Sequence, residues 1–124
     1  SKEYQLKVVA VPTIADFEME LNYPFYLNRN PEVVSGTGNA VIPEGTKVTW
    51  KISALATKDI HWLNESARFQ FINEADLFSL SKNIVQSINY QIVTSNGRIK
   101  DYEKLFYQLT VIKDQFPTIS VSYA

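Results

Sequence analysis

The sequence predicts an all-β protein, an antiparallel β-sandwich of immunoglobulin-like type. Three observations support this prediction. Apolar and polar residues alternate in about eight short segments, which is the pattern of half-buried strands. Asn, Gly and Pro gather between these segments, where turns are expected. Aromatic residues, which favour strands, are plentiful, with seven Tyr, seven Phe and two Trp in 124 residues.

The best-defined strand follows a Pro-Glu-Gly turn at residues 43–45. Proline fixes φ and glycine accepts a positive φ, so both residues favour a turn at this place. Residues 46–54 then alternate, with Val48, Trp50 and Ile52 on one face and hydroxyl or lysine side chains on the other. This pattern predicts a half-buried strand with Trp50 at the centre of its apolar face.

The remaining strands are predicted from the same alternation and from the turn residues between them. In chain order, they cover residues 4–11, 14–23, 40–42, 60–62, 67–71, 78–81, 88–92 and 105–111. Residues 28–39, rich in Asn, Gly and Pro, are expected to form a long surface loop. The only helical signal, at residues 99–104, is too short for more than a turn.

The inward-facing residues of these strands make up the predicted core. A chain of 124 residues suits one domain, and a domain of this size can bury enough apolar surface to fold without disulfides. The predicted core residues are Phe17, Met19, Leu21, Val48, Trp50, Ile52, Phe69, Phe71, Phe78, Leu80, Tyr90, Ile92, Tyr107 and Leu109.

Residues 4–14 and 107–119 share Tyr, Gln, Leu, Val, Pro, Thr and Ile in the same order. The two copies begin roughly 100 positions apart, which is the length of an immunoglobulin-like domain. This spacing predicts a tandem array with one domain at residues 12–116. Residues 1–11 would be the last strand or remnant of a preceding unit, and residues 117–124 the start of the next. Chance similarity between two β-rich segments is the alternative.

Five motifs support a family resemblance. They read YPFYL at 23–27, TGN at 37–39, PEGTKVTW at 43–50, TSN at 94–96 and VIKD at 111–114. In this order they resemble a segment of a family of long, membrane-anchored Bacteroidetes proteins whose function is not known. The resemblance implies an N-terminal membrane anchor and a large extracytoplasmic part on the periplasmic or cell-surface side, with this segment as one β-domain. The family has no established catalytic residues, so the resemblance transfers none.

A looser resemblance concerns two strands of immunoglobulin-like sandwiches. The strand after the Pro-Glu-Gly turn is similar to strand B, and the strand with Tyr90 and Ile92 is similar to strand F. Tyr90 then resembles the tyrosine-corner residue, which lies two positions before the second core position of strand F. The Cys pair of antibody domains is absent, and Trp50 or Ile52, together with Ile92, would fill its positions.

Composition limits the chemistry of the chain. The net charge is −1, so no basic surface predicts binding to nucleic acid or to acidic lipid. The lack of Cys excludes disulfides, thiolate catalysis and zinc sites built on Cys. No apolar run approaches the roughly 20 residues of a membrane helix, so we expect no direct membrane insertion by this segment. Because the chain begins at Ser1 and its only Met is Met19, we expect a mature product or a segment cut from a longer protein.

Neither a catalytic site, a metal site nor a cofactor is predicted. His61 is the only His, and we expect it to face solvent rather than to join a catalytic triad or a metal site. The carboxylate row of Asp16, Glu18 and Glu20 is expected to be a solvated strand face. Calcium at a junction between domains stays an alternative, although the chain shows no Asp-x-Asp-x-Asp loop.

Aromatic side chains are the candidate contacts for a ligand or a partner. The candidates are Tyr23, Phe25, Tyr26, Trp62 and Phe106. Aromatic faces stack on sugars or on proline-rich peptides. The alternative is that these rings cover the open end of the sandwich, because most apolar side chains are buried.

Two functions follow from these observations. The first is a non-enzymatic structural or protein-interaction module of a larger extracytoplasmic protein, with protein partners or neighbouring domains of the same chain. The second is a carbohydrate-binding module that uses exposed aromatic rings. Several coplanar exposed rings would favour the second, and buried rings would favour the first.

Overall fold

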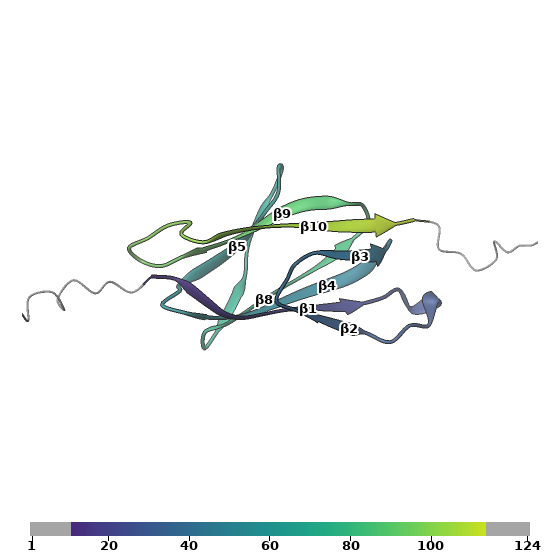
Figure 1. Ribbon diagram of the computed structural model, residues 1–124, viewed down its shortest axis with the longest axis horizontal. Helices are drawn as coiled ribbons and strands as arrows, with labels where there is room; N and C mark the ends of the chain where they lie inside the picture. Colours follow the sequence, from purple (N-terminus) through teal and green to yellow (C-terminus); the bar gives the residue numbers. More distant parts are fainter. Residues whose placement is uncertain (1–10, 114–124) are drawn as a thin grey trace, which may run out of the picture.

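The computed structural model describes residues 11–113 (Figure 1). Strands in which apolar and polar residues alternate form two stacked sheets of five strands each. The first sheet has the order β2-β1-β4-β8-β7 and contains β1 (Thr13–Asn22), β2 (Glu32–Ser35), β4 (Thr46–Leu55), β7 (Ile72–Glu74) and β8 (Leu77–Ile84). The second has the order β3-β10-β9-β5-β6 and contains β3 (Ala40–Pro43), β5 (Asp59–Leu63), β6 (Arg68–Gln70), β9 (Ile88–Ser95) and β10 (Lys104–Ile112).

The strand order is that of an immunoglobulin-like sandwich. The sequence β1-β4-β8-β7 corresponds to strands A, B, E and D, and β10-β9-β5 corresponds to strands G, F and C. Every pairing in the described residues is antiparallel except the one between β3 and β10. The predicted all-β, immunoglobulin-like fold is therefore confirmed.

The central strand β4 has the predicted alternation. Val48, Trp50 and Ile52 are fully buried, while Lys47 and Lys51 on the opposite face are exposed. The preceding turn takes the chain from β3 in the second sheet to β4 in the first. Gly45 adopts a φ of 90° in this turn, which only glycine adopts at little cost. The Thr46 hydroxyl donates to the Pro43 carbonyl at 2.7 Å and holds the turn closed.

An aromatic cluster joins the two sheets at the centre of the core. The rings of Trp50 and Tyr90 lie 5.3 Å apart, and Trp62 stacks on Tyr90 at 5.4 Å with an interplanar angle of 15°. The Trp50 indole N–H donates to the Tyr90 hydroxyl at 3.0 Å. That hydroxyl donates in turn to the carbonyl of Gly38, and burial raises the Tyr90 pKa. A tyrosine corner bonds to backbone a few residues upstream, whereas Tyr90 reaches back 52 residues.

Residues 28–39 are not the continuous loop that the sequence predicts. Within them, β2 pairs with the edge of β1, and Val34 lies opposite Met19. The Gly36 N–H continues this pairing by donating to the Phe17 carbonyl at 2.8 Å. The strand β2 was not predicted, because it has only four residues and the Asn, Gly and Pro residues around it are typical of turns.

The predicted core is correct in most positions and wrong at Phe69. The strand expected at 67–71 is divided, because the chain leaves the second sheet after β6 and enters the first at β7. Only Phe71 therefore points into the core, while Phe69 is 40% exposed on the edge strand β6. Leu80 and Tyr107 are half-buried against the core. The core residues that the sequence did not predict are Ile42, Ala54, Ile60, Trp62, Ile84 and Val93.

The tandem array stays a prediction, because its junctions lie largely outside the described residues. Pro12 lies immediately before β1, and Leu109 and Val111 lie in β10, at the places expected for them. The predicted first strand up to residue 10, the junction at Pro117 and the segment 117–124 fall outside residues 11–113. Within residues 11–113, no helix has the length and apolarity needed to cross a membrane.

Candidate functional site

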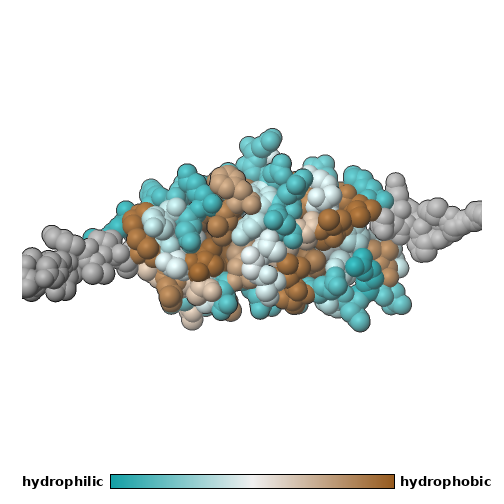
Figure 2. Space-filling view, viewed as in Figure 1, coloured by the Kyte–Doolittle hydropathy of each residue, from teal (hydrophilic) through white to brown (hydrophobic). Residues whose placement is uncertain are grey.

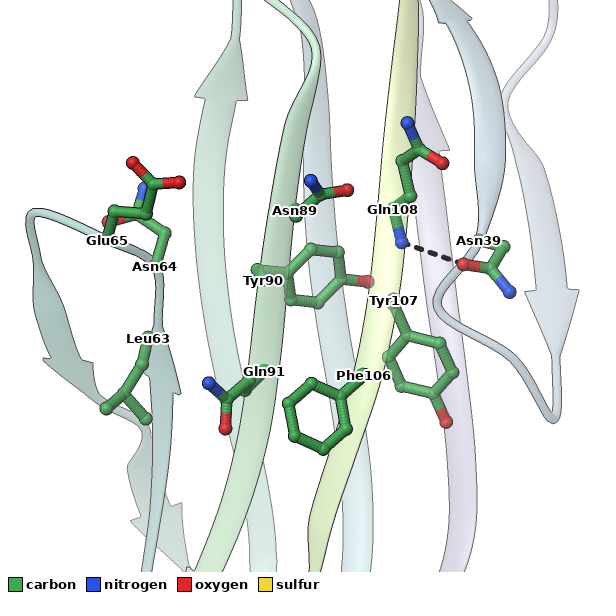
Figure 3. A pocket seen from close by; sticks show the side chains of 10 residues that line it. All are labelled: Asn39, Leu63, Asn64, Glu65, Asn89, Tyr90, Gln91, Phe106, Tyr107 and Gln108. Carbon is green, nitrogen blue, oxygen red and sulfur yellow. Dashed lines mark hydrogen bonds between the residues drawn. The ribbon is translucent and has the colours of Figure 1, made fainter.

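A hollow of about 480 Å³ lies on the second sheet beside Phe106, in the size range of small-molecule sites (Figure 3). Amide side chains dominate its lining. The lining residues are Asn39, Leu63, Asn64, Glu65, Asn89, Tyr90, Gln91, Phe106, Tyr107 and Gln108. We call this hollow the Phe106 groove.

Strand register brings these residues together from distant parts of the chain. Gln91 of β9 lies between Leu63 of β5 and Phe106 of β10. Two residues further along β9, Asn89 lies opposite Gln108. Successive side chains of a strand point to opposite faces, so the inward direction of the buried Tyr90 turns its neighbours on β9 outward.

Two of the amides are held in place by the backbone. The side-chain oxygen Oδ1 of Asn39 accepts a hydrogen bond from the Gln108 backbone N–H at 2.8 Å (Figure 3). The side-chain oxygen Oδ1 of Asn64 accepts hydrogen bonds from the backbone N–H groups of Ser66 at 2.9 Å and Ala67 at 2.8 Å. Each side chain thus uses its acceptor locally and keeps its NH₂ group, which can donate to a ligand.

The other three amides are unpaired among the described residues. The side chains of Asn89, Gln91 and Gln108 make no hydrogen bond within residues 11–113. Each carries one acceptor and two donor hydrogens. Gln91 lies beside the ring of Phe106, and the other amides lie further along the strands on one side of it (Figure 3).

Phe106 is the exposed aromatic ring of the groove, with 68% of its surface accessible. Its neighbour Tyr107 turns the other way and packs 5.4 Å from Phe17 and 5.8 Å from Tyr90. Burial, together with the charge of Glu103, raises the Tyr107 pKa. The ring of Phe106 is thus displayed on a strand whose opposite face is fixed by the core.

A second hollow, of about 260 Å³, adjoins the first. The two share Asn64, Glu65 and Asn89. The second hollow continues toward the loop between β8 and β9, and its other lining residues are Ser66, Gln86, Ser87 and Ile88. We call it the loop subsite. Together, the two hollows form an extended polar surface with Phe106 in one of them.

The structure does not bring the five predicted contact residues together. Only Phe106 lies in the groove. Phe25 and Tyr26 lie in the short 3₁₀ helix η2 (Phe25–Leu27) that follows β1, and Phe25 is 93% exposed. Their rings are 6.1 Å apart at an interplanar angle of 80°, so they form no flat platform.

Tyr23 and Trp62 are not exposed contacts. Tyr23 is half-buried, with the Arg29 guanidinium 4.0 Å from its ring centre and its hydroxyl donating to the Glu32 carboxylate. Burial, followed by the effect of Glu32, raises the pKa of Tyr23 to about 12. The prediction of Trp62 as a contact is wrong, because β5 turns this ring inward and leaves it 1% exposed.

His61 lies on the outer face of β5, as the alternation predicts, but it is half-buried there rather than fully open to solvent. Its Nδ1 atom has no hydrogen-bond partner among the described residues. Burial lowers the His61 pKa, and the positive charge of Arg68 lowers it further. His61 lies opposite Val93, two residues before Leu63 of the groove, and does not line the hollow itself.

Of the carboxylate row predicted on β1, Asp16 and Glu18 are exposed, in agreement with a solvated strand face. Glu20 pairs with Lys51 at 3.6 Å on the outer face of the first sheet. Asp101 pairs with Arg68 at 3.5 Å, and Glu103 accepts the Ile14 N–H at 3.2 Å. No group of three or more His, Cys, Asp or Glu residues in the described range is placed to hold a metal ion.

The amides of the groove were missed by the sequence reasoning. Asn and Gln have no diagnostic spacing, and they come from four separate segments that only the register unites. The alternation of residues 88–92 was a usable signal, because an inward Tyr90 places Asn89 and Gln91 on the outer face. Nothing local in the sequence indicates that Asn39 and Asn64 join them.

Comparisons with protein-family models and with curated proteins found no match for this chain. The likeness to membrane-anchored Bacteroidetes proteins therefore stays a resemblance carried by five motifs. The functional evidence for this domain is the groove and the side chains that line it.

Proposed function

We propose that this domain is a non-enzymatic recognition module of a larger extracytoplasmic, membrane-anchored protein. The single observation that supports this most is the Phe106 groove. It combines an exposed ring with three unpaired amides on the inner strands of a sheet. Exposed aromatic anchors surrounded by oriented polar groups are typical of recognition surfaces.

The groove is better suited to binding than to catalysis. Hydrolysis of a sugar bond usually needs two carboxyl groups on opposite sides of the bond. Among its described lining residues the groove has a single carboxylate, Glu65. Amides neither take up nor release protons at neutral pH, so they orient a ligand without transforming it.

The groove also has a rigid support, which the exposed tip at Phe25 lacks. β9 lies between β5 and β10, and the rings of Tyr90 and Tyr107 anchor the underside of β9 and β10 in the core. Binding sites on strands of a packed scaffold lose little entropy when a ligand binds. The three-residue helix η2 has no buried residue.

A role as a unit in a linear array is compatible with recognition. Figure 1 shows the start of β1 and the end of β10 at opposite ends of the long axis. A domain with this arrangement can join neighbours end to end and leave the outer face of the second sheet accessible. The repeat at residues 4–14 and 107–119 and the resemblance to long membrane-anchored proteins support this context.

Fragment mapping by NMR tests the proposed recognition surface. The ¹⁵N-labelled 124-residue chain is screened against a library of small neutral fragments. We expect the amide shifts to gather on β9 and β10 around Gln91, Phe106 and Gln108, because an exposed ring beside polar side chains offers a weak ligand both apolar contact and hydrogen bonds.

A matched pair of variants controls this experiment. Phe106→Ala should abolish the fragment shifts on β9 and β10, while Phe25→Ala, which removes a still more exposed ring, should leave them unchanged. Shifts that gather at η2, or that spread over both sheets without a preferred site, would overturn the assignment of the groove.

A further inference from the structure

We infer that the Phe106 groove and the loop subsite together bind a neutral oligosaccharide of more than two sugar units. This inference rests on the proposed recognition function and names the class of its ligand. It is supported by the charge of the lining, the kind of polar groups in it, the position of the groove within the sheet, and the continuity of the two hollows.

Charge favours a neutral ligand. No Lys or Arg lines either hollow among the described residues, and Glu65 is shared by both. An acidic ligand would lose hydration without gaining a cationic partner, and it would approach the Glu65 carboxylate. A cationic ligand would find only that one carboxylate, at an exposed position where an ion pair contributes little.

The polar groups match a ligand that carries many hydroxyls. A hydroxyl donates one hydrogen bond and accepts others, and an amide side chain supplies both partners. Gln91 offers such groups beside the ring of Phe106, and Asn89 and Gln108 offer them two residues further along the strands. The face of an aromatic ring is electron-rich, so it attracts the polarised C–H groups on the apolar face of a sugar ring.

Strand position disfavours an extended peptide as the ligand. A peptide that adds to a sheet needs the unpaired N–H and C=O groups of an edge strand. The groove lies over β9 and β10, which are paired on both sides, whereas the edges of this sheet are β3 and β6. Recognition at the groove therefore depends on side chains.

Continuity of the two hollows predicts more than one sugar site. Asn64, Glu65 and Asn89 line both the groove and the loop subsite. One sugar would stack on Phe106, and the following units would pass Asn89 toward Gln86 in the loop subsite. Contacts in both hollows add binding energy that a single sugar cannot collect.

Titration of the 124-residue chain with neutral sugars of increasing length tests this inference. The probes are gluco-, manno-, xylo- and N-acetylglucosamine oligosaccharides as mono-, di- and tetrasaccharides. Acidic uronic-acid tetramers and a proline-rich peptide serve as comparisons. We expect one neutral series to bind with affinity that rises from disaccharide to tetrasaccharide, measured by calorimetry and by amide shifts on β9 and β10.

Three variants locate the sugar sites. Phe106→Ala should weaken binding of both lengths about tenfold, since it removes the stacking platform. Gln86→Ala should weaken tetrasaccharide binding by roughly two- to tenfold and leave disaccharide binding unchanged, because it lines only the loop subsite. Phe25→Ala, at the distant tip, should change neither.

The outcomes separate this inference from the proposed function. Fragments that map to the groove while every neutral oligosaccharide fails to bind would refute the sugar assignment and leave recognition intact. Preference for the uronic acids or the peptide would do the same. Equal affinity for mono- and tetrasaccharide would refute the two-hollow site. Failure of all probes, fragments included, to reach the groove would overturn the proposed function as well.

Discussion

Two cross-strand pairs of polar side chains interact on the outer face of the first sheet, whereas a pair on β9 and β10 of the second sheet does not. On the first sheet, the Glu20 carboxylate lies 3.6 Å from the Lys51 ammonium, and the hydroxyls of Thr49 and Ser81 are 2.8 Å apart. On the second, Asn89 and Gln108 face each other in register without a side-chain hydrogen bond. A face whose groups already satisfy one another gains little from a ligand. Asn89 and Gln108 therefore keep hydrogen-bonding capacity that a ligand could use, whereas the Thr49–Ser81 pair does not.

The hydropathy of the surface agrees with localised rather than broad contact. On the side shown in Figure 2, hydrophobic patches are separated by hydrophilic ones and do not merge into one apolar area. A large apolar area would indicate an obligate protein interface. A single exposed ring within polar surroundings suits a small polar ligand better.

The largest effect is expected when the support common to both faces is removed. Trp50→Ala deletes the ring between the two sheets and leaves the Tyr90 hydroxyl without its indole donor. We expect a loss of roughly 3–5 kcal/mol in the free energy of unfolding, measured by chemical denaturation. A loss below about 1 kcal/mol would show that the two faces do not share this support.

A second prediction concerns the second sheet alone. A Cβ at Gly38 would lie 2.3 Å from the Tyr90 hydroxyl and 2.6 Å from the Tyr107 ring. Gly38→Ala should therefore cost about 1–3 kcal/mol of stability by overpacking. It should also move the NMR signal of the Gln108 N–H, which Asn39 next to Gly38 accepts. Shifts confined to the first sheet would contradict this placement.

Double-mutant cycles on two cross-strand pairs measure the difference between the faces directly. Thr49 and Ser81 are paired by a hydrogen bond, so their coupling energy should be about 0.2–1 kcal/mol. Asn89 and Gln108 are opposite each other without such a bond, so their coupling energy should be near zero. Equal coupling energies in urea denaturation would remove the distinction between the faces.

The smallest effect concerns the pH dependence of stability. Burial lowers the His61 pKa below its ordinary value of 6.5, so the unfolded chain binds a proton more readily than the folded one. The contribution of neutral His61 to the free energy of unfolding is therefore fully present above pH 6.5, and it is lost as the pH falls toward the lowered pKa. His61→Gln should reduce the fall in stability between neutral and mildly acidic pH. If His61→Gln left the pH dependence of stability unchanged, another group would have to cause the fall in stability.

Strand alternation allowed the fold to be predicted, because one face of each long strand is buried. Val48, Trp50 and Ile52 alternate over enough residues to leave no ambiguity. Short edge segments carry weaker signals, as β2 shows within residues 28–39. Phe69 was wrongly assigned to the core, because the apolar and polar residues keep alternating where the chain passes from the second sheet to the first at Phe71.

The candidate site could be predicted only in part. The outward position of Phe106 was predicted correctly, because this residue alternates with Leu105 and Tyr107 along the strand. Trp62 was misjudged, since a five-residue strand does not reveal which of its faces is buried. The amides came together through the register of β5, β9 and β10, which depends on the whole sandwich and not on any local stretch.

The parallel pairing of β3 with β10 has a mechanical consequence. β10 lies between β3 and β9, and its end lies at the opposite end of the long axis from the start of β1 (Figure 1). A tensile force along that axis would load β10 in shear, so that its hydrogen bonds to both neighbours must rupture together rather than one at a time. Such a strand resists extension far better than a hairpin that unzips. In a chain pulled between two anchors, β10 would be the strand that bears the load.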